Sequence, residues 1–128
     1  MSETKKNDAL KNDGVDGAEL EAAITEAADA EGGYLHKFKK PFLWQGTEYD
    51  TLLFDFESLS GRDMNNIERE LAITEGITVI SPTMSGPFLM NMAAKAAGIG
   101  YDMLLAMPIF EANRIRSKAR SFLLSSEL

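Results

Sequence analysis

The chain has 128 residues, of which 45% are hydrophobic and 26% charged, a composition typical of a single soluble globular domain. No apolar run approaches the ~18 residues that a membrane-spanning helix needs, and residues 1–15 lack the apolar core of a secretory signal. The absence of cysteine excludes disulfides, thiol nucleophiles and thiolate metal sites, and it fits a reducing cytoplasm.

The formal charge of −7 is concentrated at the N-terminal end of the chain. Residues 1–36 carry three lysines against nine acidic residues, a net charge of −6, whereas residues 37–128 carry only −1. Because phosphate binding depends on clustered lysine and arginine, this distribution argues against nucleic acid as the main partner.

Residues 1–33 are expected to form an acidic, largely disordered arm, because residues 1–18 are polar and have little to bury. Within the arm, residues 19–30 place a narrow apolar stripe at helical spacing, made by Leu20, Ala23, Ile24, Ala27 and Ala28. An isolated helix of this length is marginal in water, so we expect it to form only when it docks on another surface. Gly32 and Gly33 mark the boundary with a domain over residues 34–128.

The next segment predicts an antiparallel β-hairpin. Residues 34–38 alternate as a strand does, and Pro41 confines this segment to a sheet edge or to the start of another strand. Residues 42–44 and 49–56 favour strands as well, and the sequence Gln45-Gly46-Thr47-Glu48 between them predicts a short turn. One face of the second arm is strongly apolar and must be covered, and it consists of Leu52, Phe54 and Phe56.

The rest of the chain predicts three to four helices. The first begins at the capping arrangement Ser60-x-x-Asp63 and continues to Gly76, and residues 77–84 then form a β-prone loop. The second begins at Ser85 and ends at Gly98. A short helix covers residues 101–107, and a last one follows Pro108 to about residue 124. The expected fold class is α+β, with the hairpin packed against these helices.

Few side chains could carry out catalysis. His36, the only histidine, is expected to be a half-exposed strand residue among lysines, and no serine has the Gly-x-Ser-x-Gly setting of a nucleophile. Gly98-Ile99-Gly100 follows a helix rather than a strand, which favours a helix stop over a phosphate-binding turn. A calcium loop is rejected because Gly14 and Ala23 would occupy ligand positions.

The charged side chains favour a solvated surface. No pair of carboxylates is placed in an apolar cleft that would separate their pKa values. The basic residues of the last helix suit its C-terminal dipole as well as they suit any partner, and they are Arg114, Arg116, Lys118 and Arg120. We therefore expect no enzyme, no metal site and no cofactor.

The most unusual feature is the apolar excess of two helices. Between Phe88 and Ala97 only Asn91 and Lys95 are polar, and residues 103–110 contain no polar side chain. Helices of this kind must be covered on all sides, yet a domain of ~90 residues buries only about 60 to 65% of its chain surface. Two interpretations stay open: core packing with methionines that fill gaps, or exposure at a partner or self-association surface.

Several short motifs follow one another in a fixed order along residues 35–124. They are Leu35-x-Lys37 to Lys40-Pro41-Phe42, Tyr49-x-x-Leu52-x-Phe54-x-Phe56, Leu59-Ser60-Gly61-x-Asp63, Ala93-Ala94-Lys95-Ala96-Ala97-Gly98 and Phe122-Leu123. This order resembles the small tail assembly chaperones of contractile-tailed phages, including the Mu-like and P2-like versions. The acidic arm and the methionine-rich stretch depart from that family's pattern.

The resemblance implies a non-enzymatic protein that acts in the host cytoplasm and is absent from the mature virion. Its partners would be the tape-measure protein, which it keeps soluble, and the tail-tube protein, which it helps to recruit. Self-association stays open, and neither a membrane nor nucleic acid is an expected partner. An alternative is a structural tail-completion or connector protein of the virion, in which the hairpin is an oligomerisation edge.

An amphipathic helix of the tape-measure protein would bind an apolar groove. From the apolar excess we expect the residues that contact this partner to be Phe88, Met92, Met103, Met107 and Phe110.

Overall fold

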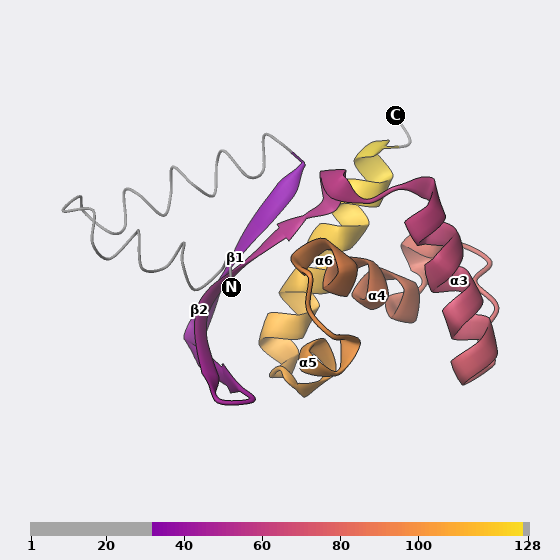
Figure 1. Cartoon of the computed structure of the whole chain (residues 1–128). Helices are drawn as coiled ribbons and strands as arrows, with labels where there is room; N and C mark the ends of the chain where they lie inside the picture. Colours follow the sequence, from indigo (N-terminus) through magenta and orange to yellow (C-terminus); the bar gives the residue numbers. More distant parts are fainter. Residues whose placement is uncertain (1–31, 127–128) are drawn as a thin grey trace.

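The computed structural model describes residues 32–126 (Figure 1). The expectations of a disordered arm and of a docked helix over residues 19–30 therefore lie outside the described residues. The elements are β1 (Gly33–Trp44), β2 (Thr47–Asp55), η1 (Phe56–Ser58), α3 (Gly61–Glu75), η2 (Pro82–Met84), α4 (Gly86–Ala97), α5 (Tyr101–Ala106) and α6 (Ile109–Ser126). The expected α+β class is confirmed, with an antiparallel hairpin and four α-helices in the described part of the chain.

The hairpin turn is shorter than the sequence predicted. Trp44 pairs with Thr47, so the loop consists only of Gln45 and Gly46. Both residues have positive φ, 48° and 82° respectively. Two consecutive residues with positive φ are the requirement of a type I′ turn, whose twist matches that of the two strands.

A bulge interrupts the register of β1 near its middle. Lys37 pairs with Thr51 and Phe42 pairs with Tyr49, so residues 38–41 lie opposite the single residue Asp50. Pro41 lies in this bulge, where its missing N–H costs no ladder hydrogen bond. β1 continues through Pro41, so no separate strand begins there.

The apolar face of the hairpin forms one wall of the core, as predicted. Leu52, Phe54 and Phe56 are almost completely buried and belong to one cluster with residues of the four helices. Figure 1 shows the hairpin along one side of the molecule and α3 on the opposite side, with α4 and α6 between them. α4 contacts β2, and α6 contacts β1.

Helix α4 is the centre of the core. Its N-cap Ser85 accepts a hydrogen bond from the backbone N–H of Phe88 (3.2 Å), and the helix ends at Gly98, as predicted. It contacts β2, α3, α5 and α6. Its buried residues are Phe88, Leu89, Met92, Ala93, Ala94, Ala96 and Ala97. Elements of the same chain thus cover a helix that is apolar on nearly all sides.

The ends of the other helices agree closely with the sequence signals. At the start of α3, Asp63 N–H donates to the Ser60 hydroxyl (3.3 Å) and Ser60 N–H donates to the Asp63 carboxylate (2.8 Å), a reciprocal capping box. Residues 77–81 form no strand, and η2 follows them. The Arg120 side chain donates to the carbonyl of Thr83 (2.9 Å) and so ties η2 to α6.

The positive φ of Gln45 predicts a stabilising substitution. Asn tolerates this conformation better than Gln, and Asn-Gly is the preferred pair in a type I′ turn. We expect Gln45→Asn to raise the free energy of unfolding by up to about 1 kcal/mol, and Gln45→Val to lower it. Urea denaturation followed by circular dichroism measures both changes. Equal stability of the two variants would contradict a type I′ turn with positive φ at residue 45.

Candidate functional site

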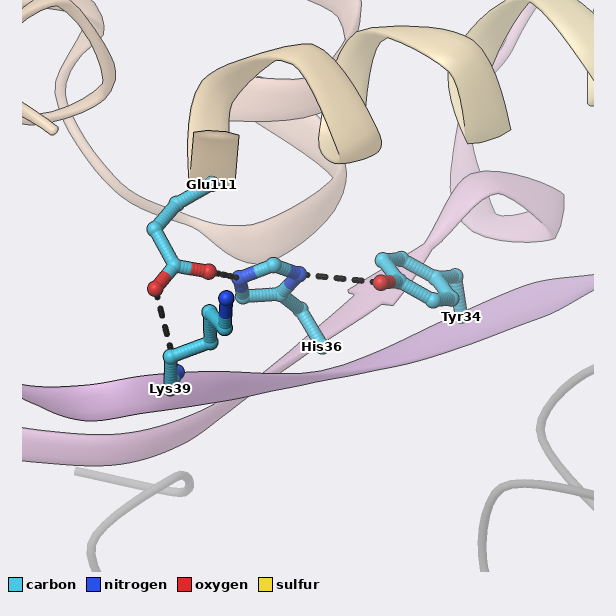
Figure 2. A network of polar contacts seen from close by, with 4 residues as sticks. All are labelled: Tyr34, His36, Lys39 and Glu111. Carbon is cyan, nitrogen blue, oxygen red and sulfur yellow. Dashed lines mark hydrogen bonds and ion pairs between the residues drawn. The ribbon is translucent and has the colours of Figure 1, made fainter. Parts of the chain in front are cut away.

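The described residues contain one buried polar network, formed by Tyr34, His36, Glu111 and the backbone of Lys39 (Figure 2). Nε2–H of His36 donates to one carboxylate oxygen of Glu111 (2.9 Å). The Tyr34 hydroxyl donates to Nδ1 of the same ring (2.9 Å). The other carboxylate oxygen of Glu111 accepts the backbone N–H of Lys39 (3.0 Å). The network joins strand β1 to the first turn of α6.

The local backbone explains why a carboxylate is buried at this point. Lys39 lies in the bulge of β1, where no regular strand pair is formed, and its N–H would otherwise lack a ladder partner. Glu111 stands in the first turn of α6, where the helix dipole favours negative charge. Both carboxylate oxygens are thus hydrogen-bonded, which offsets part of the cost of burying the charge.

His36 is buried, which corrects the expectation of a half-exposed strand residue. Burial lowers the pKa of His36 below its ordinary value of 6.5. The Glu111 carboxylate raises the pKa through its hydrogen bond and its charge, whereas the positive charge of Arg114 lowers it. Burial is the largest of these effects, so the imidazole is neutral at neutral pH and carries its proton on Nε2.

This environment favours a structural role for His36. A general acid or base must reach the proton of a substrate directly or through one water molecule. Both ring nitrogens of His36 are instead engaged inside the protein, and the ring packs edge-on against Phe38 with centroids 4.8 Å apart. The imidazole therefore links β1 to α6 and presents no free nitrogen to a substrate.

The structure separates the five residues expected to contact a partner. Phe88, Met92, Met103 and Met107 are buried in the core, so the expectation that they form an exposed binding surface is wrong. The physical reason is that β2, α3, α5 and α6 already cover α4. Phe110 alone is exposed.

Phe110 lies in a short segment with other exposed apolar side chains, which the sequence had indicated only as a stretch without polar side chains. The side chains of Leu105, Ile109 and Phe110 are 60%, 86% and 45% exposed. They lie within six residues, on either side of the connection between α5 and α6, and we call them the junction patch. Sequence reasoning missed Leu105 and Ile109 because helical periodicity is lost where one short helix ends and another begins.

Basic side chains border the junction patch. The Lys39 ammonium lies 4.2 Å from the centroid of the Phe110 ring, and the Arg114 guanidinium lies 5.7 Å from it. Contacts of this kind are cation–π interactions. A ligand on the junction patch would therefore meet apolar side chains next to positive charge.

The described residues show neither a metal cluster nor a membrane span. Within residues 32–126, no group of three or more His, Cys, Asp or Glu residues could hold a metal ion, and no helix there is long and apolar enough to cross a bilayer.

Comparisons of the chain with protein-family models, with curated proteins and with solved structures find no match.

The neutral state of buried His36 predicts acid-sensitive stability. The unfolded chain binds this proton near pH 6.5, whereas the folded chain binds it only at lower pH, so the free energy of unfolding falls as the pH drops through about 6.5. We expect wild type to lose more stability than His36→Gln between about pH 7.5 and about pH 5.5. Urea denaturation at each pH measures the difference. A growing advantage of wild type in acid would show a charged imidazole paired with Glu111.

The burial of the methionines predicts a contrast between two truncations. Met103→Ala removes a core side chain and should lower the free energy of unfolding by about 2 to 5 kcal/mol, whereas Ile109→Ala should change it by about 0.5 kcal/mol or less. Thermal or urea unfolding distinguishes these values. Similar small effects at both positions would place Met103 outside the core.

Proposed function

We propose that this chain is a tail assembly chaperone of a contractile-tailed phage. It binds the tape-measure protein, keeps that long polypeptide soluble and helps to recruit tail-tube subunits. It acts in the host cytoplasm and leaves the assembly before the virion is complete.

The junction patch is the observation that carries this proposal. Three large apolar side chains are exposed in a six-residue stretch that spans the connection between α5 and α6. Other apolar residues in and next to this stretch, such as Met103 and Met107, are buried in the core. Grouped apolar side chains on a surface mark sites where another protein binds. A helix with an apolar face, presented by the tape-measure protein, would bury these side chains.

The residues that carry the resemblance have definite places in the fold. Tyr49, Leu52, Phe54 and Phe56 belong to the buried face of the hairpin, and Ser60 with Asp63 caps α3. The stretch from Ala93 to Gly98 packs in the core and ends α4. Several of these motif residues thus occupy positions that determine this fold.

The environment of His36 also favours a binding function. The single histidine of the chain is held in a closed network between β1 and α6. Its hydrogen bonds position the start of α6, and two residues of the junction patch, Ile109 and Phe110, lie in that same turn.

Co-expression with the tape-measure protein tests the proposal. We expect the wild-type chain to raise the soluble fraction of that partner. Ile109→Glu should weaken binding about tenfold or more, because one buried isoleucine contributes about 1.5 to 3 kcal/mol. Ile109 is the first residue of α6, where an acidic side chain suits the helix dipole, so the variant should fold.

Ile80→Glu is the matched control, because Ile80 is 93% exposed but lies in the loop before η2. This variant should retain the solubilising effect. Equal loss of binding in both variants would contradict a specific role of the junction patch. No effect of the wild-type chain on the partner's solubility would contradict the proposed function itself.

A second candidate function is a tail-completion or connector protein, and the sheet is the observation that favours it. Among the described residues the sheet has only two strands, so each strand has one edge without a neighbouring strand, and such edges are suited to pairing between subunits. Mass spectrometry of purified particles separates the two functions, because only a structural component persists in the virion.

A further inference from the structure

A groove runs between the start of β1 and the C-terminal half of α6. It has a volume of about 290 Å³. We call it the β1–α6 groove, and its lining consists of Gly32, Gly33, Tyr34, Phe56, Lys118, Ser121, Phe122 and Ser125. It differs from the junction patch, which lies at the other end of α6.

The floor of the β1–α6 groove is aromatic. Phe122 is half-buried and stacks on Phe56 with ring centroids 5.3 Å apart, and Tyr34 completes the floor. Because Tyr34 and Phe56 are already buried, the groove offers a shallow apolar contact, chiefly through Phe122. A narrow apolar stripe of small side chains fits such a surface better than bulky residues do.

The lining of the groove includes one basic residue, Lys118. The Lys118 ammonium lies over the ring of Tyr34, 5.2 Å from its centroid. Arg114 is exposed one helical turn before Lys118 and lies on the same side of α6. The side chain of Glu57 lies close to Gly32, at the β1 side of the groove. An acidic ligand would therefore place its charges on the side of α6.

We infer that residues 19–30 of the same chain bind in the β1–α6 groove. Residues 12–31 contain seven acidic residues and no lysine or arginine, so their charge is opposite to that of Lys118 in the groove lining. The stripe is narrow and mostly alanine, which suits the shallow floor at Phe122, and it consists of Leu20, Ala23, Ile24, Ala27 and Ala28.

The connection of the chain favours this occupant over a free partner. Gly32 lines the groove, and residue 30 precedes it by only two positions, so the segment is tethered at the rim. A short tether gives a high effective concentration, of millimolar order. As a helix, the twelve residues would span about 18 Å, the same length as the twelve residues of α6 from Arg114 to Ser125.

Binding of this segment would change the charge along α6. Its acidic side chains would neutralise Lys118 at the groove and Arg114 one helical turn earlier, and Arg114 also contacts the ring of Phe110 in the junction patch. The acidic segment would thereby lower the positive charge beside the junction patch. This inference does not depend on the proposed function, and its test requires no phage protein.

Disulfide trapping tests the inference in the full chain, which contains no cysteine of its own. One cysteine replaces Ser121 in the groove, and the other replaces either Ala23 or Ala27. We expect an intrachain disulfide to form in at least one pair in a glutathione redox buffer, and we expect its rate not to change with protein concentration. Non-reducing electrophoresis and peptide mass spectrometry measure the rate and the linkage.

Charge reversal distinguishes two causes of disulfide formation: binding of the segment in the groove, and mere closeness of the two cysteines in a tethered chain. Adding Lys118→Glu and Arg114→Glu to the trapped pair should slow intrachain disulfide formation about tenfold or more, as should 0.5 M NaCl. Adding Arg62→Glu, a charge reversal of an exposed residue on α3, should leave the rate unchanged. Far-ultraviolet circular dichroism verifies that each variant folds.

Three results would overturn the inference. One is an equal rate in the Lys118→Glu, Arg114→Glu variant and the Arg62→Glu variant, which would show proximity without binding. Another is a disulfide that forms between chains and accelerates with concentration, which would assign the groove to a second copy. The last is the absence of an intrachain disulfide in both cysteine pairs.

Discussion

The buried carboxylate of Glu111 is the interaction on which the arrangement of hairpin and helices depends. One oxygen accepts a hydrogen bond from the His36 imidazole, and the other accepts one from the backbone N–H of Lys39. A single side chain therefore fixes α6 against the bulge of β1. A buried charge is tolerated only where hydrogen bonds replace its water. Here the bulge supplies one of those bonds, because it releases an N–H from the strand ladder. The bulge in β1 and the buried carboxylate in α6 therefore depend on each other, because each supplies the hydrogen-bond partner that the other needs.

The position of α6 in turn determines how the apolar excess is divided. With α6 against β1, helix α4 is enclosed by β2, α3, α5 and α6, and most of its apolar side chains are buried, whereas Lys95 is exposed. Part of the remaining excess is at the α5–α6 junction, where Leu105, Ile109 and Phe110 are exposed. An apolar residue at such a junction is exposed because the chain changes direction there. The sequence composition of residues 103–110 is uniform, but this change of direction separates Met103 and Met107 from Leu105 and Ile109.

Local chemistry made most of the fold predictable. Capping residues, αL glycines and strand alternation are short-range signals, and for this reason the starts and ends of α3 and α4 were located correctly. The environment of His36 was not predictable, because its partner Glu111 is 75 residues away and nothing local marks the pair. The prediction of an exposed binding surface failed for a related reason. Periodicity shows that an apolar helix must be buried against other elements, but it does not show whether those elements belong to the same chain or to a partner. Phe88 and Met92 needed cover, and the chain itself supplied it.

The same distinction shows which residues bear on function. The short motifs of residues 35–124 include a helix cap, bulge positions and core aromatics, so their residues serve the fold. The side chains of the junction patch serve no such purpose, since Ile109 and Leu105 are largely exposed and contribute little to the core. Lys39 contributes its backbone to the Glu111 network and its ammonium to the ring of Phe110. The bulge that satisfies the buried carboxylate thus also brings a cation to the apolar surface, and a partner helix with acidic residues beside its apolar face would match both.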